Sequence, residues 1–311
     1  MKIEEALAGW LLEDYRKAAI SAAKLNAKIL EFYISKQYKG TTIERIRKSI
    51  PGVKELDRII NNLCSMQIIK NSKNTRFFYY REYYLITAFS EQTVESIVCS
   101  IYEYGYISYL SSMRYYGITD RIPKKVHFTS CDQLQWKIKS IEDLEEKIPK
   151  IKNKDYEEIK YFIPNFPKNI EIDGYDLIHH TITKYIQPKI SNTGVRVQDI
   201  GLLFLDILRE PDYSGGVDHV ISVFKEFAPK YYRRIISQTN SYGKAIDKAR
   251  VGFLFEKVLS INSDMISEWK KEKSNQRGGS RKLISSRAFS PKICAEWNIS
   301  VNVEELHKYA D

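Results

Sequence analysis

Hydrophobic side chains recur at helical spacing in two stretches near the start of the chain. The first stretch predicts an amphipathic helix within residues 1–21, which must pack on its own chain or on a second copy. Its apolar positions are Ile3, Ala6, Leu7, Trp10 and Leu11. A second helical pattern runs through Ala22, Leu25, Ile29, Phe32 and Tyr33 and ends near Gly40.

A short second helix is predicted directly after Gly40. Thr41-Thr42-Ile43-Glu44 has the form of a capping box, in which the Thr41 hydroxyl and the Glu44 carboxylate satisfy amide donors at a helix start. Ile43, Ile46 and Ile50 would give this helix an apolar side. Pro51-Gly52 then breaks the pattern, and a further helix is expected from Val53.

The helix expected from Val53 separates its apolar and polar residues. At about 100° per residue its apolar side consists of Val53, Leu56, Ile59, Ile60 and Leu63. The opposite side carries a polar stripe of Lys54, Arg58, Asn61 and Ser65, with Asn62 at its edge. Because Arg and Lys donate to guanine and Asn pairs with adenine in the major groove, these five residues are candidates for base contacts.

A β-hairpin is expected after this helix. Ile68-Ile69-Lys70, the turn 71–74 and the strand 75–80 would form the wing of a winged helix-turn-helix. Cations near the wing and before the helix are candidates for phosphate contacts, which supply affinity more than sequence choice. They are Arg45, Arg47, Lys48, Lys70, Lys73 and Arg76.

The charge of the chain is concentrated in this region. The 311 residues contain 49 Lys and Arg against 39 Asp and Glu, and residues 22–81 hold 13 − 4 = +9 of the resulting +10. This imbalance favours a nucleic acid as the partner of that segment. Two alternatives remain open at this point, a solvated lysine-rich surface and a winged helix that binds protein.

The remainder of the chain has mixed helix and strand signals. Tyrosine-rich helices are expected near 91–116 and a strand at Lys125–Thr129, and the charged segments 142–160 and 270–282 are expected to be surface connections. The predicted fold class is therefore α+β, with an N-terminal winged helix-turn-helix followed by a larger mixed domain. The expected parts are the helix in 1–21, the DNA-binding domain 22–85 and the C-terminal domain 86–311.

Catalytic chemistry is not expected. The four cysteines are far apart without histidines at ligand spacing, and His179-His180 on a strand would point to opposite faces, so we expect no metal and no cofactor. Asp264, Glu268 and Lys270 would share a helix, and Glu171, Asp173 and Asp176 would surround a turn at Gly174. A nuclease, which needs clustered carboxylates, is the alternative from another functional class.

The sequence also bears on the cellular compartment. Acidic residues in Met1-Lys2-Ile3-Glu4-Glu5 argue against a signal peptide, and no run of about 20 apolar residues occurs. We therefore expect a cytoplasmic protein without a membrane partner.

Five short motifs resemble the AbiE antitoxin family. From Ser108 to Gly117 the chain has the pattern Ser-x-Leu-Ser-x-x-x-x-x-Gly, which leads through Thr119, Asp120 and Pro123 into a strand. Gly117 would end the helix in the left-handed conformation. The later motifs are Val197 to Asp206, Pro211 to Gly216, Arg250 to Glu256 and Trp297 to Asn302, so that the resemblance covers roughly residues 25–305. The family often has an acidic residue and an arginine where this chain has Gly201 and Leu202.

This resemblance implies an antitoxin of a type IV toxin–antitoxin system that acts in phage defence and represses its own promoter. The implied partners are double-stranded DNA with inverted repeats and a nucleotidyltransferase-like toxin, with no stable complex between the two proteins. A stand-alone transcriptional repressor is the alternative. Lys124, Lys125, Arg233 and Arg234 are the candidate residues for the surface that neutralises the toxin, and a solvated surface is the other interpretation of each.

Overall fold

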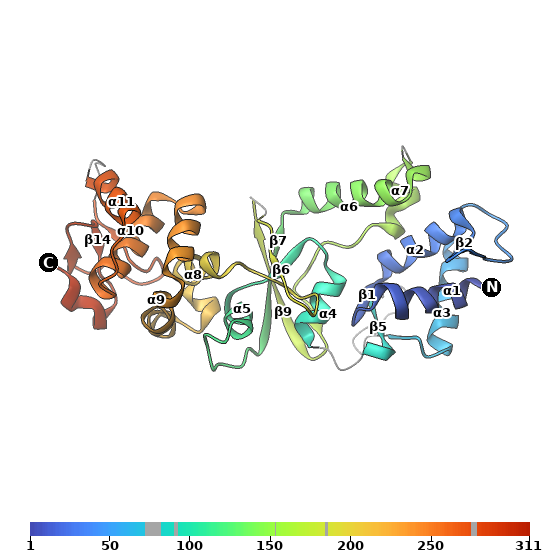
Figure 1. The fold of residues 1–311 in the computed structure, drawn as a ribbon, viewed down its shortest axis with the longest axis horizontal. Helices are drawn as coiled ribbons and strands as arrows, with labels where there is room; N and C mark the ends of the chain where they lie inside the picture. Colours follow the sequence, from blue (N-terminus) through green and yellow to red (C-terminus); the bar gives the residue numbers. More distant parts are fainter. Residues whose placement is uncertain (72–81, 90–92, 153, 184–185, 275–278) are drawn as a thin grey trace. The chain divides into compact units, whose positions relative to one another are not determined.

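The fold mixes α-helices with several β-sheets. The computed structural model describes residues 1–71, 82–89, 93–152, 154–183, 186–274 and 279–311. The chain forms two compact units, one of residues 1–107 with 124–196 and one of residues 108–123 with 197–311 (Figure 1). Both domain boundaries expected from the sequence, after residues 21 and 85, fall inside the first unit.

Three helical segments near the N-terminus enclose the first hydrophobic core. The first helix is confirmed: Ile3, Leu7 and Leu11 are buried, and the helix continues into a π-helical segment. The Ser21 side chain accepts from the Lys24 amide and begins the next helix, as N-caps do. The bounds are α1 Ile3–Gly9, η1 Trp10–Tyr15, α2 Ala22–Ser35 and α3 Val53–Ser65.

A three-stranded sheet accompanies these helices. Its order is β1-β5-β4, and both pairings are antiparallel. In the register, Leu85 of the middle strand lies opposite both Ala19 and Lys70. The strands are β1 Ala19–Ser21, β4 Ile69–Asn71 and β5 Tyr83–Ile86, followed by the 3-10 turn η2 Thr87–Phe89.

The prediction of a helix at residues 41–50 is wrong. The strands β2 Gln37–Tyr38 and β3 Thr41–Thr42 pair instead, joined by a turn in which Lys39 and Gly40 both have positive φ. The amides of Ile43 and Glu44 donate to the carbonyls of Lys36 and Met1, so the donors that a capping box would serve are already satisfied. Ile43 is buried without a helix, whereas Ile50 is 40% exposed.

A six-stranded sheet forms the second core of the first unit. Its order is β10-β11-β6-β7-β9-β8, with β7 and β9 parallel and β6 antiparallel to β7. The strand expected at Lys125 is confirmed, as is the turn at Asp173-Gly174, where both residues have positive φ. The elements are α4 Val94–Ile101, β6 Gly105–Ile107, β7 Lys125–Cys131, β8 Glu171–Ile172, β9 Tyr175–Ile182, β10 Lys189–Ile190 and β11 Arg196–Val197.

The expectation that 142–160 is a surface connection is also wrong. Leu144, Ile148, Ile151 and Ile159 are buried in the core formed by the N-terminal helices. Leu144 lies on α6, Ile148 directly follows this helix and Ile151 lies on η3, whereas Glu146, Lys147 and Lys150 between them are exposed. The elements are α6 Gln133–Lys147, η3 Pro149–Ile151, α7 Tyr156–Ile159 and η4 Lys160–Phe162.

The second unit is mainly helical. Gly117 has φ +65° just beyond α5, which confirms the expected left-handed helix end. The segment 270–282 is a loop only in part, because α11 extends to Ser274 and residues 275–278 lie outside the described ranges. The elements are α5 Tyr109–Tyr115, α8 Ile200–Arg209, η5 Pro211–Ser214, α9 Val217–Tyr242, α10 Ala245–Phe253, η6 Leu254–Val258, α11 Asp264–Ser274, β12 Arg281–Lys282, β13 Ile293–Cys294, β14 Ile299–Ser300 and η7 Glu304–Tyr309.

Close packing of α8 on α9 explains the glycine at position 201. A β-carbon there would lie 2.5 Å from the backbone oxygen of Arg234, so an acidic side chain at this position would separate the two helices. Within the described ranges, no helix combines the length and apolar character that a membrane crossing requires.

Candidate nucleic-acid interface

The helix α3 begins and packs largely as its sequence predicts. The Gly52 amide donates to Oε2 of Glu55 at 2.8 Å, which satisfies one free donor at the helix start. Leu56, Ile59, Ile60 and Leu63 are buried in the first core, as expected. The assignment of Val53 to the buried side is wrong, since it lies in the first turn and is 47% exposed.

The polar stripe of α3 is open to solvent. Lys54, Arg58, Asn61 and Ser65 are exposed, and Asn62 at the stripe's edge is half-buried. The Ser65 hydroxyl donates to the backbone carbonyl of Asn61 at 3.0 Å, so this bond does not involve the Asn61 side chain. A helix carrying Lys, Arg and Asn on one open side presents the donors and acceptors that major-groove base edges match.

A buried carboxylate from α1 holds two of these side chains. Oε1 of Glu4 accepts from Nη1 of Arg58 at 3.0 Å and from Nδ2 of Asn62 at 2.9 Å. The Glu4 side chain is 11% exposed and that of Arg58 is 57% exposed. Burial opposes ionisation of Glu4, but the bond from Asn62 and the positive charge of Arg58 outweigh it and lower its pKa. Glu4 therefore orients Arg58 and partly compensates its charge.

The candidate phosphate contacts surround α3 only in part. Arg45, Arg47 and Lys48 are exposed in the irregular segment before the helix, and Lys70 is exposed on β4. Lys48 approaches Glu55 to 4.0 Å. Lys73 and Arg76, like the expected turn and second strand at 71–80, lie outside the described residues except for Asn71. The strand that pairs with β4 in the described ranges is β5, further along the chain than we expect from the sequence.

The candidate antitoxin residues fall in different units. Lys124 and Lys125 are exposed at the start of β7 in the first unit, and Arg233 and Arg234 are exposed on α9 in the second. Arg234 donates through Nε and Nη2 to Oδ2 of Asp199 at 2.9 and 2.7 Å, and this contact raises the arginine's pKa. The four candidates therefore form two separate pairs, one in each unit.

The histidines of β7 and β9 form hydrogen-bonded contacts within the sheet. Nδ1 of His127 lies 3.0 Å from Nε2 of His180, and Nε2 of His179 lies 2.8 Å from the Ser130 hydroxyl. Burial lowers the pKa of each of the three histidines to about 4. His179 and His180 thus each contact a different residue of the neighbouring strand, and both are neutral near pH 7.

Of the candidates for catalysis on α11, Lys270 forms an ion pair with a carboxylate of the same unit. Asp264, Glu268 and Lys270 share α11, as expected, and Lys270 lies 2.8 Å from Oε1 of Glu256. Among the residues with described placement, no three His, Cys, Asp or Glu side chains are grouped so that they could hold a metal ion.

Sequence reasoning missed Glu4, because its partners are more than fifty positions away along the chain. The only local signal is an acidic residue directly beside the apolar positions of the first helix. Its contact with Arg58 depends on how α1 packs against α3, which the spacing of neither helix specifies.

Comparison with models of known protein families finds no match to this chain. Comparison with curated proteins finds none either.

Proposed function

We propose that residues 1–86 form a winged helix that binds double-stranded DNA, with α3 in the major groove. The order α1, β1, α2, α3, β4, β5 and the sheet order β1-β5-β4 support this proposal, since a winged helix places three helices against a small sheet in this way. Under this proposal the module begins at α1 and not at residue 22, and α1 with η1 takes the place of the helix expected at 41–50.

The open polar stripe on α3 carries the proposal. Its side chains stand on the side of the helix opposite the four buried leucines and isoleucines, so α3 can lie against a duplex without losing its core contacts. Asn61 and Lys54 supply base-reading chemistry, and the exposed arginines at 45 and 47 supply charge beside the helix. A protein-binding surface would be expected to place aromatic or apolar side chains at its centre, and this stripe has none.

Direct binding measurements test the proposal. The full chain should bind a duplex taken from the region upstream of its own coding sequence more tightly than a scrambled duplex of equal length. Lys54→Glu should abolish this binding, whereas Lys150→Glu, which reverses an exposed lysine on η3, should leave it nearly unchanged. Equal binding by both variants would refute the assignment of α3.

We further propose that the chain is a non-catalytic regulator with antitoxin activity. The five motifs that carry the family resemblance lie in the second unit, and residues of different motifs contact one another there. The Tyr116 hydroxyl donates to the Gln198 carbonyl at 2.7 Å, and Arg121 donates to the Gly215 carbonyl at 2.7 Å. A β-carbon at Gly252 would lie 2.2 Å from the Trp297 ring. The motifs therefore belong to one packed core, and this arrangement supports the antitoxin proposal.

Co-expression tests the antitoxin role. The product of the adjacent gene should arrest growth when expressed alone, and growth should recover when this chain is supplied from a separate promoter. Recovery should persist with Lys54→Glu, because none of the candidate neutralising residues belongs to the polar stripe of α3. If the wild-type chain does not rescue growth, the antitoxin role is refuted and a stand-alone repressor is the remaining function. Magnesium-dependent cleavage of DNA or RNA by the purified protein would contradict the non-catalytic assignment.

A further inference from the structure

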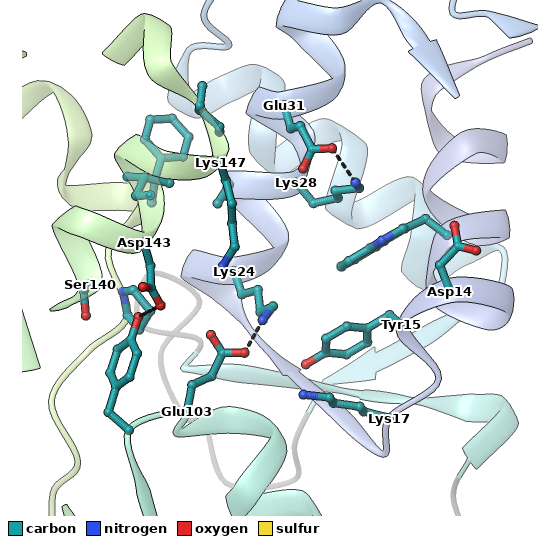
Figure 2. Close-up of a pocket in the computed structure, with 17 residues that line it drawn as sticks. Asp14, Tyr15, Lys17, Lys24, Lys28, Glu31, Glu103, Ser140, Asp143 and Lys147 are labelled. Carbon is teal, nitrogen blue, oxygen red and sulfur yellow. Dashed lines mark hydrogen bonds and ion pairs between the residues drawn. The ribbon is translucent and has the colours of Figure 1, made fainter. Parts of the chain in front are cut away.

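A cavity of about 450 Å³ opens within the first unit (Figure 2), and none of its lining residues belongs to α3. Its walls come from η1, α2, α6 and the turn between α4 and β6. This volume is in the range of small-molecule sites. Its polar lining includes Lys17, Lys24, Lys28 and Lys147.

The lining holds four lysines and four carboxylates, and three of the lysines act on one of these carboxylates. Glu103 forms an ion pair with Lys24, and Lys17 and Lys147 also act on it electrostatically. Burial opposes the ionisation of Glu103, but the three lysines outweigh it and lower the pKa of the carboxyl. Figure 2 shows these lysines directed toward the same space. One carboxylate thus faces three ammonium groups.

The remaining acids of the lining have partners of their own. Asp143 accepts from the Tyr104 hydroxyl at 2.6 Å, Glu31 lies 2.6 Å from Nζ of Lys28, and Asp14 accepts from Tyr38. Across the described ranges, no carboxylate lies within 4.0 Å of the ammonium group of Lys17 or Lys147. Burial, followed by repulsion from Lys24, lowers the pKa of Lys17. An anion bound here would relieve that unfavourable environment.

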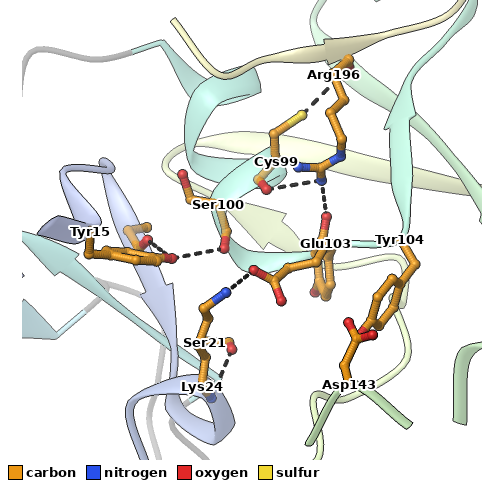
Figure 3. Close-up of polar contacts among 11 residues, drawn as sticks. Tyr15, Ser21, Lys24, Cys99, Ser100, Glu103, Tyr104, Asp143 and Arg196 are labelled. Carbon is orange, nitrogen blue, oxygen red and sulfur yellow. Dashed lines mark hydrogen bonds and ion pairs between the residues drawn. The ribbon is translucent and has the colours of Figure 1, made fainter. Parts of the chain in front are cut away.

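Hydrogen bonds fix the turn that carries Glu103 (Figure 3). Arg196 donates to the carbonyls of Cys99, at 3.0 Å, and of Tyr102 at the end of α4, and to Gly105 at 2.6 Å. The Tyr15 hydroxyl contacts the carbonyls of Ala19 at 3.0 Å and Ser100 at 3.3 Å. A cation at a helix C-terminus satisfies carbonyls that have no partner in the helix. These bonds therefore hold the backbone of this turn, and with it the position from which Glu103 enters the cavity.

The other part of the lining is aromatic and apolar. Trp10, Tyr104, Phe162 and Leu144 belong to the lining, beside the lysines. Such a surface suits a flat ring, and two unmatched ammonium groups suit a dianion. We propose that this cavity binds a nucleoside monophosphate, with its phosphate at Lys17 and Lys147 and its base against the aromatic side chains.

Calorimetric titration of the full chain tests this proposal. AMP, GMP, CMP and UMP are titrated separately, with the matching nucleosides and inorganic phosphate as further probes. At least one monophosphate should bind more tightly than its nucleoside and than phosphate alone. Absence of binding by all four at low millimolar concentration, or equal binding of nucleoside and monophosphate, would overturn the proposal.

Variants locate the site. Lys17→Met and Lys147→Met each keep an apolar stem but remove a charge, and each should weaken monophosphate binding at least about tenfold. Lys150→Met, on the adjacent 3-10 turn but outside the lining, is the matched control and should bind as the wild type does. Lys17→Met should also melt at or above the wild-type temperature, because a poorly solvated charge is lost, which separates lost binding from lost folding. Wild-type affinity in both lining variants would overturn the assignment, whatever the outcome of the DNA-binding tests.

Discussion

The contact between Glu4 and Arg58 gives a sharp test of how α3 meets DNA. Replacing Glu4 by Gln keeps an oxygen that can accept from Asn62 but removes a negative charge 3.0 Å from the guanidinium of Arg58. Because Arg58 is 57% exposed, the lost ion pair should cost only about 0.2–1 kcal/mol of unfolding free energy. The protein should therefore remain folded, and its DNA binding can be compared directly with that of the wild type.

The expected gain in DNA affinity follows from the removed repulsion. A carboxylate about 7 Å from a phosphate repels it by about 0.6 kcal/mol at an effective dielectric constant of about 80 and by about 2.4 kcal/mol at about 20. Removing this repulsion should tighten binding by about threefold to about fiftyfold. The freed Arg58 charge should also steepen the dependence of log K on log salt by about 0.9.

Fluorescence anisotropy over a series of salt concentrations measures both quantities. The change should occur on the upstream duplex and on a scrambled one, because phosphate contacts do not depend on sequence. Glu226→Gln, an exposed position on α9, makes the same change in net charge and should have a much smaller effect. If Glu4→Gln matches this control in affinity and in salt slope, Arg58 does not face the duplex and the proposed orientation of α3 is refuted.

Three further predictions concern other parts of the molecule. Asn61→Ala should reduce discrimination between the upstream and scrambled duplexes by about 1–3 kcal/mol without changing the salt slope, and binding titrations that show a uniform loss would assign Asn61 to the backbone instead. His127 and His180 have pKa values lowered from 6.5 to about 4, chiefly by burial, so the unfolded chain binds more protons between these values. The free energy of unfolding should therefore be fully retained above about pH 6.5 and fall toward pH 4, and the fall should be smaller in His127→Gln. Denaturant titrations across this pH window that give the same fall for the wild type and the variant would contradict this prediction. Gly201→Ala should lower the unfolding free energy by about 1–3 kcal/mol because its β-carbon meets the backbone of α9, whereas Gly279→Ala, with open space around it, should not, and equal melting temperatures would show that α8 and α9 can separate freely.

Local patterns predicted the elements whose burial is decided within one helix or strand. The helical spacing of apolar positions in α3 predicts that Leu56 and Ile59 are buried, and the structure confirms it. The strand at Lys125 and the turn at Gly174 follow from β-branched residues and from a residue that tolerates positive φ. These features depend on neighbours a few positions away, which the sequence displays directly.

Features that depend on distant partners could not be predicted in this way. The capping box at Thr41 is a valid local pattern, but the Glu44 amide donates to the carbonyl of Met1, and that choice is made by tertiary packing. The segment after Glu142 looked like a connection because charges dominate its composition, although Leu144 and Ile148 pack on the N-terminal helices. The contact of Glu4 with Arg58 joins positions 54 apart and has no counterpart in the spacing of either helix.

The charge of residues 22–81 that is available to DNA also depends on contacts with distant residues. A window sum of +9 treats every cation as available to DNA. In the structure, Lys24 pairs with Glu103, Lys39 with Glu13 and Asp14, and Arg58 with Glu4, and all of these acids lie outside the window.

The exposed cations without a carboxylate partner lie mainly on α3 and in the segments beside it. Among the residues of this window whose placement is described, Lys36, Arg45, Arg47, Lys54 and Lys70 have no carboxylate within 4.0 Å and are exposed. The lysines of α2, in contrast, line the cavity and contact its acids. A duplex and a mononucleotide would therefore use different cations of the same unit. Their binding should be compatible, and any influence of one on the other has to pass through the shared packing of α1 and α2 and not through competition for charge.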